Sequence, residues 1–385
     1  MRPANTIMAN LGTTVFEVMS RLAMEHGSIN LGQGFPDEDG PRDIRQVAAD
    51  ALVEGPNQYP PMTGLAELRQ AIAAHARRFY GLDYDWQSEI VVTSGATEAL
   101  ADCFLALLNP GDEVVLLEPL YDSYPPMIER AGAIPRYVTL EPPEWELDPV
   151  ALEEAFTPRT RMILLNSPMN PAARVLTMAE LDLIRRMCIE HDVICLCDEV
   201  YEHLLFDGLE HRPIASLDGM RGRTLRISSA GKIFSLTGWK VGWIEGPAAL
   251  MTAVMKAHQF VTFTTAPNLQ KAVAYGLAKE TAYYTDLAAT LQNKRDRLAR
   301  GLAKAGFPVL PCQGTYFINA DITPFGITGG DEAFCRLITE KAGVTAVPVS
   351  AFMRKGSIDT LIRFCFCKQD DVLDAAADRL QRFLA

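Results

Sequence analysis

The sequence predicts an α/β protein, with a large domain built on a mostly parallel seven-stranded sheet covered by helices and a smaller α+β domain. The chain has 385 residues, which is more than a single hydrophobic core usually supports, so we expect two domains. Between about residues 65 and 250, short apolar β-rich runs alternate with helical patterns. Strands that are apolar almost throughout are typical of a sheet with helices on both faces.

Seven runs in this first part of the chain have the composition of buried strands. The predicted strands are residues 89–95, 113–119, 133–140, 161–168, 193–200, 224–231 and 240–246. Helical patterns lie between them, over residues 97–108, 121–132 and 177–191. Another helix is predicted from Leu65, because apolar residues recur at three- and four-residue steps as far as Phe79.

The pattern changes after about residue 250. The next segments predict a long helical region, two strands and a closing amphipathic helix, over residues 268–305, 307–321, 360–368 and 370–384 in that order. The first 45 residues look irregular and are rich in Gly and Pro. We therefore expect residues 46–280 to form the large domain, and residues 1–45 together with 281–385 to form the small one.

Composition and charge exclude several classes of function. The formal net charge is -12, which argues against a nucleic-acid-binding protein, since affinity for nucleic acid rests on clustered Lys and Arg. The start of the chain, "MRPANTIMAN", lacks the apolar segment of a secretory signal, and no apolar run approaches the ~18 residues of a membrane span. We expect a cytoplasmic protein with no nucleic-acid or membrane partner.

The eight cysteines and the histidines predict no metal site. None of the cysteines forms C-x-x-C, and several lie inside apolar runs such as "CLC" and "CFC". Buried, reduced thiols are therefore the expected state. His203 and His258 have no metal-ligand spacing with another His or Cys, so we expect structural roles for them.

The stretch "SSAGKIFSLTGWK" holds a lysine, Lys232, that three chemistries could use. A nucleotide phosphate loop needs G-x-x-x-x-G-K-[ST], but Arg226 occupies the first glycine position and Ile233 follows the lysine. Ser229 and Lys232 match S-x-x-K of the penicillin-binding enzymes, yet their partner motifs S-D-N and K-T-G are absent from the chain. The remaining chemistry is a lysine aldimine with pyridoxal phosphate, which requires several partner groups.

The chain offers candidates for those partners. In "VVTSGATEAL" (91–100) a strand ends, turns and starts a helix, whose free N–H groups and dipole attract a phosphate. Asp198 ends an almost wholly apolar strand, where a carboxylate needs a cationic partner such as a protonated pyridine nitrogen. "NSPMNP" (166–171) ends another apolar strand with two asparagines, a pattern that also suits an ordinary turn.

These stretches resemble the class I/II pyridoxal-phosphate-dependent aminotransferases, which have the aspartate-aminotransferase-like fold type I. The motifs "TSGATEAL", "EPLYDSY", "NSPMNP", "CDEVYEHL" and "SSAGKIFSLTGWKVGW" stand in the family's order. The match extends through "NLGQGFPD", "NQYPPMTGLAELRQAI", "HQFVTFTTAP", "GTYF", "VPVSAF" and "IRFCF", over nearly the whole chain. The closest likeness is to the branch of kynurenine–oxoglutarate and methionine aminotransferases and cysteine-S-conjugate β-lyases.

The resemblance implies a role for each matching residue around the cofactor. Lys232 would form the aldimine and later move the proton at the substrate's α-carbon, while Asp198 would pair with the pyridine N–H. Asn170 and Tyr201 would donate to the phenolate oxygen, and Tyr121 would stack on the ring. The residues implied at the phosphate are Gly95, Ala96, Thr97, Ser229 and Lys240.

The resemblance also implies a substrate site and a homodimer with shared active sites. Arg363 lies in the apolar run "LIRFCF" and would bind the substrate carboxylate, together with Asn170 and the backbone of Gly34. Phe16 would stand where kynurenine-type relatives often have a tryptophan in the pocket wall. Tyr59 of "NQYP" would reach the phosphate of the neighbouring subunit.

The expected activity is a ping-pong transfer of an amino group from a large neutral amino acid to a 2-oxo acid. The donor would be of the methionine, aromatic, kynurenine or glutamine type, since an aromatic pocket wall and the lack of a second arginine motif disfavour aspartate. One departure from the common pattern is Ala172-Ala173-Arg174 after "NP", which predicts a different loop there. Two alternatives remain: β-elimination from cysteine S-conjugates at the same site, and a non-catalytic ligand-binding regulator of the same fold.

Overall fold

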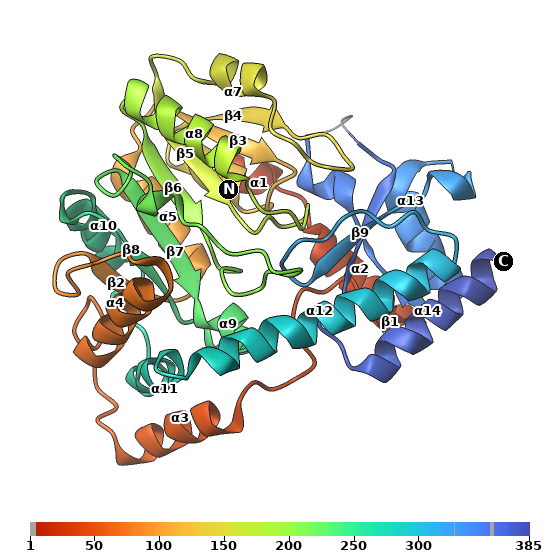
Figure 1. Ribbon diagram of the computed structural model, residues 1–385, viewed down its shortest axis with the longest axis horizontal. Coiled ribbons are helices and arrows are strands. Elements are labelled where there is room, and N and C mark those ends of the chain that lie inside the picture. Colours follow the sequence, from red (N-terminus) through yellow and green to blue (C-terminus); the bar gives the residue numbers. More distant parts are fainter. Residues whose placement is uncertain (1–4, 327, 355–357) are drawn as a thin grey trace, which may run out of the picture.

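The computed structural model describes residues 5–326, 328–354 and 358–385. Two groups of elements lie side by side, and the long helix α12 (Thr281–Lys304) runs along both of them (Figure 1). One group contains the seven-stranded sheet, and the other contains a three-stranded sheet with its helices. Residues 1–4, the start of the expected small-domain segment, lie outside the described residues.

The large sheet has its seven strands in the order β2-β8-β7-β6-β5-β3-β4. Their bounds are β2 (Ile90–Thr93), β3 (Glu113–Glu118), β4 (Ile134–Thr139), β5 (Thr160–Asn166), β6 (Ile194–Asp198), β7 (Thr224–Ser229) and β8 (Gly242–Glu245). Every predicted run of the first part thus contains or overlaps one strand. All neighbours pair in parallel except β8, which is antiparallel to both β2 and β7. The prediction of a mostly parallel sheet is confirmed.

Helices cover both faces of this sheet, because alternate strand residues point to opposite sides. On β3, Val114 and Leu116 pack in one core with α5 (Ala96–Leu107), α6 (Tyr124–Arg130) and α10 (Ala248–Val261). The residues between them, Val115 and Leu117, pack in another core with α7 (Pro149–Ala155) and α8 (Met178–Glu190). A third core joins β2 and β8 to α3 (Arg42–Glu54), α4 (Ala66–Tyr80) and α11 (Pro267–Leu277).

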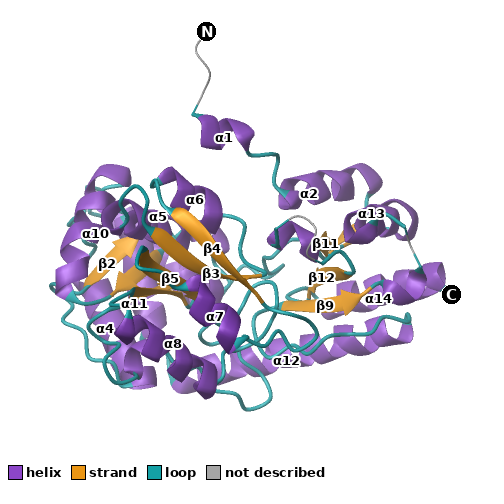
Figure 2. Ribbon diagram, turned by 90° about the horizontal axis from the view of Figure 1, so that it is seen from above, coloured by secondary structure: helices purple, strands orange, loops and turns teal. Residues whose placement is uncertain are grey.

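The second group of elements is built on the antiparallel sheet β11-β12-β9. Its strands are β9 (Phe317–Asp321), β11 (Val347–Pro348) and β12 (Leu361–Cys365), and its helices include α13 (Gly330–Leu337) and α14 (Asp370–Leu384). Phe334, Phe364 and Leu380 are among the fully buried residues of its core, which also takes side chains from α12. Figure 2 shows this sheet beside the larger one, with α12 and α14 on the same side of it. The exact division into two domains stays a prediction.

The expectation of an irregular N-terminal segment is wrong. The segment contains the helices α1 (Thr6–Asn10) and α2 (Val15–His26), and α3 begins within it. The Thr14 side chain accepts from the Glu17 N–H at the start of α2, and Gly27 ends the helix in the left-handed region. Strand β1 (Ile29–Asn30) then pairs in parallel with β10 (Val344–Thr345), which ties the segment to the second group of elements.

Other differences from the predicted elements have local causes. The helical region 268–305 is two helices, α11 and α12, separated at residues 278–280. The helix expected over 121–132 begins only at Tyr124, since prolines occupy its first turn. Of the stretch 307–321 only β9 is a strand. Short helical turns complete the structure: α9 (Ala230–Ile233), η1 (Ile214–Ser216), η2 (Thr237–Trp239), η3 (Thr323–Phe325), η4 (Ile338–Ala342) and η5 (Val349–Phe352).

The eight cysteines are all buried, as their positions in apolar runs indicated. Among the helices of the described residues, none is both long enough and apolar enough to span a membrane.

Candidate active site

A cavity of about 420 Å³ brings together nearly all residues that the sequence singled out. Its lining includes Phe16, Gly34, Gly95, Ala96, Thr97, Tyr121, Asn170, Asp198, Tyr201, Ser229, Lys232, Lys240 and Arg363. Only Tyr59 among the predicted site residues is absent from this lining. The cavity receives residues from the large sheet, from the N-terminal segment and from β12.

The large sheet contributes through the carboxyl ends of its parallel strands. Asn166, Asp198 and Ser229 are the last residues of β5, β6 and β7. The carboxyl ends of neighbouring parallel strands meet at one edge of the sheet, where open α/β folds bind their ligands. The strand order therefore explains why three motifs far apart in the sequence meet in one cavity.

Lys232 lies on the short helix α9 and is held by a tyrosine. Its Nζ donates to the Tyr316 hydroxyl at 2.6 Å, and this hydroxyl donates to the Gly34 carbonyl oxygen at 2.7 Å. Burial lowers the pKa of Lys232 to about 8, from an ordinary value of 10.5. A substantial fraction of the amine is therefore neutral near neutral pH, the form that attacks an aldehyde.

Asp198 lines the cavity, and both of its carboxylate oxygens accept a hydrogen bond. Its Oδ2 accepts from the Tyr124 hydroxyl at 2.7 Å, and its Oδ1 accepts a longer bond of 3.4 Å from the Val200 N–H. Burial raises the pKa of this carboxyl. A protonated ring nitrogen beside Asp198 would offset that cost by stabilising the carboxylate.

Arg363 enters the cavity from β12 and is partly paired. Its guanidinium donates to Asn170 Oδ1 at 2.7 Å and to the Gly32 carbonyl oxygen at 3.1 Å, while its Nε has no partner among the described residues. Burial lowers the pKa of Arg363 to about 10. The guanidinium lies 3.8 Å from the centre of the Phe317 ring. A buried cation with neutral partners and a free donor suits an anionic ligand such as a carboxylate.

Asn170 is positioned by the loop that leads out of β5. The Asn170 N–H donates to Asn166 Oδ1 at 2.8 Å, and Asn166 Nδ2 donates to the carbonyl oxygen of Asp198 at 2.9 Å. These two bonds connect the ends of β5 and β6. They set the amide of Asn170 between Arg363 and the residues around Asp198.

The start of α5 is a candidate anion site. No side chain of the described residues caps this helix, and its N-cap residue is Gly95, with φ of 82°. The N-terminal N–H groups are therefore open to the cavity, as phosphate sites require. Lys240 Nζ lies close beside Gly95, 3.2 Å from where a Cβ of that residue would be. The Ser229 hydroxyl lines the same corner and accepts from the Gly231 N–H at 3.2 Å.

Gly242 allows this close packing at the anion site. A Cβ on Gly242 would lie 2.7 Å from the carbonyl carbon of Gly95 and 2.8 Å from the N of Ala96, both of which are backbone atoms. Only glycine lets β8 approach the first turn of α5 so closely. The anion site, the acidic group and the amine together fit the expected pyridoxal phosphate.

Sequence reasoning missed three residues that hold the site in place. Tyr316 binds Lys232, Tyr124 binds Asp198, and Asn166 connects β5 to β6. Tyr316 lies in the stretch "GTYF" and Tyr124 in "EPLYDSY". These stretches contributed to the family resemblance but indicated no role for either tyrosine. Their partners are 84 and 74 residues away in the chain, a separation that no local pattern reports.

A buried ion cluster lies next to the loop that follows β6. The guanidinium of Arg226 binds Glu199 at 2.6 Å, Glu245 at 2.6 Å and Glu202 at 3.1 Å. Glu199 and Glu202 flank Val200 and Tyr201 in the chain, so the cluster restrains the loop that carries Tyr201. An arginine in the apolar run "TLRISS" was the available signal, and the sequence analysis did not use it.

Tyr59 lies on the surface, away from the cavity of its own chain. Its side chain is 84% exposed and packs edge-on against Phe263, with ring centres 5.6 Å apart. Phe260, 85% exposed, and Val261 lie on the adjoining helix α10. These four residues, Tyr59, Phe260, Val261 and Phe263, are here called the Tyr59 patch.

A second cavity of about 1100 Å³ adjoins the first. Phe16 and Tyr121 line both cavities. The second one is lined by charged side chains of both signs, which are Asp122, Glu332, Arg336, Arg354 and Asp359. The two cavities therefore adjoin at two aromatic rings, and the wall of the larger one carries these charges among apolar side chains.

Comparison with known proteins identifies what this site resembles. The family model for aminotransferase class I and II matches residues 27–380. A solved structure of N-succinyldiaminopimelate aminotransferase from Mycobacterium tuberculosis superposes with a TM-score of 0.96 at 47% identity, covering 100% of both chains. The methionine aminotransferase of Escherichia coli is 40% identical over 97% of each chain. Kynurenine–oxoglutarate transaminase 1 of Rattus norvegicus is 37% identical over 94% of each chain.

Proposed function

This chain belongs to the family of class I and II aminotransferases and is a pyridoxal-phosphate-dependent transaminase, and from that premise we propose that it transfers the amino group of a large neutral amino acid to a 2-oxo acid. One observation carries the proposal: the partly neutral amine of Lys232 shares a cavity with the carboxyl of Asp198, the guanidinium of Arg363 and the uncapped start of α5.

The cofactor supplies, when bound, an aldehyde that condenses with amines and a protonated ring that withdraws electrons from the substrate's α-carbon. In the proposed arrangement the start of α5, Ser229 and Lys240 would hold its phosphate. Asp198 would keep the ring nitrogen protonated, and the Tyr124 hydroxyl orients that carboxylate. Tyr121 would stack on the ring, and Asn170 and Tyr201, which also line the cavity, would donate to the phenolate oxygen.

Lys232 is the proposed base of the reaction. Its Nζ would take up the proton of the substrate's α-carbon, which requires the neutral amine, and would later return a proton. The bond to Tyr316 fixes the position of Nζ. Arg363 and Asn170 bind the substrate carboxylate, and the anchored carboxylate presents the α-hydrogen to the lysine.

The preference for a large neutral donor rests on the aromatic wall of the cavity. Phe16, Phe35 and Phe317 line the cavity near Arg363 and would bury an apolar or aromatic side chain. The methionine and kynurenine activities named for two relatives are of this class.

The second cavity favours one other substrate class. A donor with a long polar side chain could extend past Phe16 and Tyr121 to the charged residues of that space. The substrate named for the Mycobacterium tuberculosis relative, N-succinyldiaminopimelate, has such a chain. Elimination at the β-carbon of cysteine S-conjugates uses the same lysine and remains the alternative reaction. The regulator alternative is set aside, because the relatives are enzymes.

We also propose a cytoplasmic homodimer in which Tyr59 reaches the phosphate site of the second subunit. The observation that supports the homodimer is the Tyr59 patch, which is apolar and exposed and includes the last two residues of α10. The two-domain division, with residues 46–280 in the large domain, belongs to the same proposal.

A screen of half-reactions tests the proposal. Purified enzyme is mixed separately with methionine, phenylalanine, kynurenine, glutamine, aspartate, N-succinyldiaminopimelate and a cysteine S-conjugate, and the absorbance of the bound cofactor is followed. Rapid conversion by the large neutral donors supports the proposed class. Conversion by N-succinyldiaminopimelate alone assigns the second class, and pyruvate with ammonia identifies elimination.

A further inference from the structure

Helices α5 and α10 bury a cluster of three titratable side chains that the proposed reaction does not use. Glu98 and Asp102 lie one turn apart on α5 and face His258 of α10. His258 Nδ1 is 2.8 Å from Glu98 Oε1 and 3.5 Å from Asp102 Oδ2. The Asp102 side chain is fully buried, and neither of its oxygens has a hydrogen-bond partner among the described residues.

The tautomer of His258 follows from its other ring nitrogen. His258 Nε2 lies 2.9 Å from the carbonyl oxygen of Met62, which can only accept, so Nε2 carries a hydrogen. In a neutral imidazole, Nδ1 then presents its lone pair to the two carboxylates. Three acceptors converge in the protein interior, an arrangement that requires a proton or a cation between them.

Counting charges distinguishes the two possibilities. A proton on Nδ1 places one positive charge against two carboxylates and leaves Asp102 without a hydrogen bond. A further proton on Asp102 cancels the remaining charge, but it requires a carboxyl group to hold a proton at neutral pH, where carboxyl groups are normally ionised. A divalent cation beside a neutral imidazole cancels both negative charges and satisfies all three side chains at once.

The protonation equilibria describe the cluster without an ion. Burial raises the pKa of Asp102 to about 6. Burial opposes a charge on His258, but the carboxylates of Asp102 and Glu98 raise its pKa to about 9. Near neutral pH the imidazole therefore holds a proton, which a metal ion at this place would displace.

We propose that Glu98, Asp102 and His258 bind a divalent transition-metal ion, with Zn²⁺ as the best match. The site offers four donor atoms, because both Asp102 oxygens are free to join Glu98 Oε1 and His258 Nδ1. Tetrahedral zinc bonds of about 2.0–2.1 Å place neighbouring donors about 3.3–3.4 Å apart. The 3.5 Å between His258 Nδ1 and Asp102 Oδ2 is close to this spacing, whereas Glu98 Oε1, at 2.8 Å from Nδ1, would move outward by about 0.5 Å. The bond from Nε2 to a backbone carbonyl is the support that metal-bound histidines usually have.

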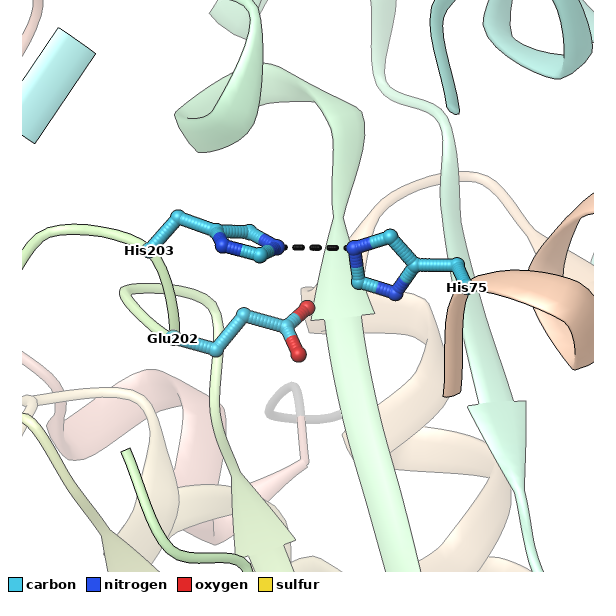
Figure 3. Close-up of side chains that lie close together, drawn as sticks. All are labelled: His75, Glu202 and His203. Atoms are coloured by element: carbon cyan, nitrogen blue, oxygen red, sulfur yellow. Dashed lines mark hydrogen bonds between the residues drawn. The ribbon is translucent and has the colours of Figure 1, made fainter. Parts of the chain in front are cut away.

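A second cluster, made of His75, Glu202 and His203, has fewer features of a metal site than the first (Figure 3). His75 Nε2 and His203 Nε2 are 2.7 Å apart and share a hydrogen bond, so each of these ring nitrogens already has a partner. Glu202 beside them already accepts from the Ser228 hydroxyl and pairs with Arg226. This cluster is satisfied without an ion, so it provides an internal control.

An ion at the proposed site would stabilise the cofactor-binding edge of the protein. The Ser94 N–H donates to Glu98 Oε2, and Ser94 directly precedes Gly95 at the start of α5. The Met62 carbonyl belongs to the segment that follows Tyr59. The ion would therefore connect α5 and α10 to this segment and raise the stability of all three.

Metal analysis of the holoenzyme tests the proposal. Wild type, Asp102→Asn, His75→Gln and the exposed-surface control Asp286→Asn are produced in zinc-supplemented medium, dialysed against metal-free buffer and measured by plasma mass spectrometry. We expect about one zinc per chain in wild type and in the control, and less than about a tenth of that in Asp102→Asn. Added zinc should raise the thermal midpoint of wild type but not of Asp102→Asn.

Three outcomes would overturn the proposal. The first is wild-type holoenzyme without zinc, a result that does not depend on how any variant folds. The second is zinc retained by folded Asp102→Asn. The third is loss of the ion from His75→Gln while Asp102→Asn keeps it, which assigns the metal to the other cluster.

Discussion

Lys232, Tyr316 and Gly34 form a hydrogen-bonded chain that joins the large sheet's edge to β9 and the N-terminal segment. The lysine itself was identifiable from its motif, because glycine before it and a strand before that are local features. The lowered pKa of Lys232 could not be predicted from the motif, since burial is a property of the packed molecule. Three predictions belong at this scale.

Replacing Lys232 by Ala should lower the turnover of every amino-acid donor by about 10³-fold or more, because the base of the proton transfer is lost. Cofactor retention should persist, since the start of α5, Ser229 and Lys240 are untouched. Steady-state transamination and cofactor content measure the two effects. Lys304→Ala, at an exposed helix end, is the control, and normal turnover by Lys232→Ala would remove the lysine from its role.

The lowered pKa of Lys232 predicts a pH dependence for cofactor loading. Burial favours the neutral amine, so the reactive fraction rises as pH rises through about 8 rather than through 10.5. Apoenzyme mixed with pyridoxal phosphate should therefore load faster with increasing pH and level off above about 8.5. Stopped-flow absorbance follows the loading. A rate that keeps increasing beyond pH 10 would contradict the lowered pKa.

Replacing Arg363 by Ala should raise KM for amino acids and oxo acids, with a smaller effect on cofactor binding. Loss of charge-assisted hydrogen bonds worth about 2–3 kcal/mol should lower kcat/KM by roughly 30- to 150-fold. Arg363→Lys should recover only part of this, because an ammonium does not form the planar fork. Arg300→Ala on α12 is the exposed control, and unchanged KM values across several donors would exclude the role.

At the scale of elements, the start of α5 is held against β8 by the close approach at Gly242. The sequence predicted both elements within a few residues, because strand and helix periods are local patterns. The helices α2 and α3 were not predicted, because they begin in a segment whose Gly and Pro residues suggested irregular structure. The sequence pattern also extended β9 too far toward its N-terminal side, since alternation alone does not reveal which residues pair.

Gly242→Ala should weaken cofactor binding by about 10-fold or more, because its Cβ would displace the first turn of α5 from the anion site. Equilibrium titration of apoenzyme with pyridoxal phosphate measures this effect. Gly238→Ala is a matched control, since a Cβ there meets nothing within 4 Å. Equal affinity of the folded Gly242→Ala protein and the control would show that the approach has no role in binding.

At the scale of the whole molecule, the candidate site depends on both groups of elements. Lys232 and Asp198 come from the large sheet, whereas Arg363 comes from β12 and Phe16 from α2. The Tyr59 patch concerns contacts with a second chain, because its apolar side chains face outward. An exposed apolar group of this kind is typical of an interaction surface.

Phe260→Asp should dissociate the proposed homodimer, because it places a charge within the Tyr59 patch. Sedimentation should show a fall in mass to that of one chain, together with weaker cofactor retention. Val150→Asp, at an exposed position on α7, should keep the mass of wild type. A wild-type protein that sediments as a monomer with full activity would contradict the shared site.

The sequence by itself determined the class of fold, the strand runs of the large sheet and the identity of many residues that line the cavity, but not of Tyr124 and Asn166. These follow from local periodicity and from motifs whose residue types have one shared chemistry. Only the tertiary structure decided that Tyr316 and Tyr124 hold Lys232 and Asp198, and that His258 faces Glu98 and Asp102. Hydrogen bonds and burial join residues that are distant in the chain, so they depend on packing, which local patterns do not encode.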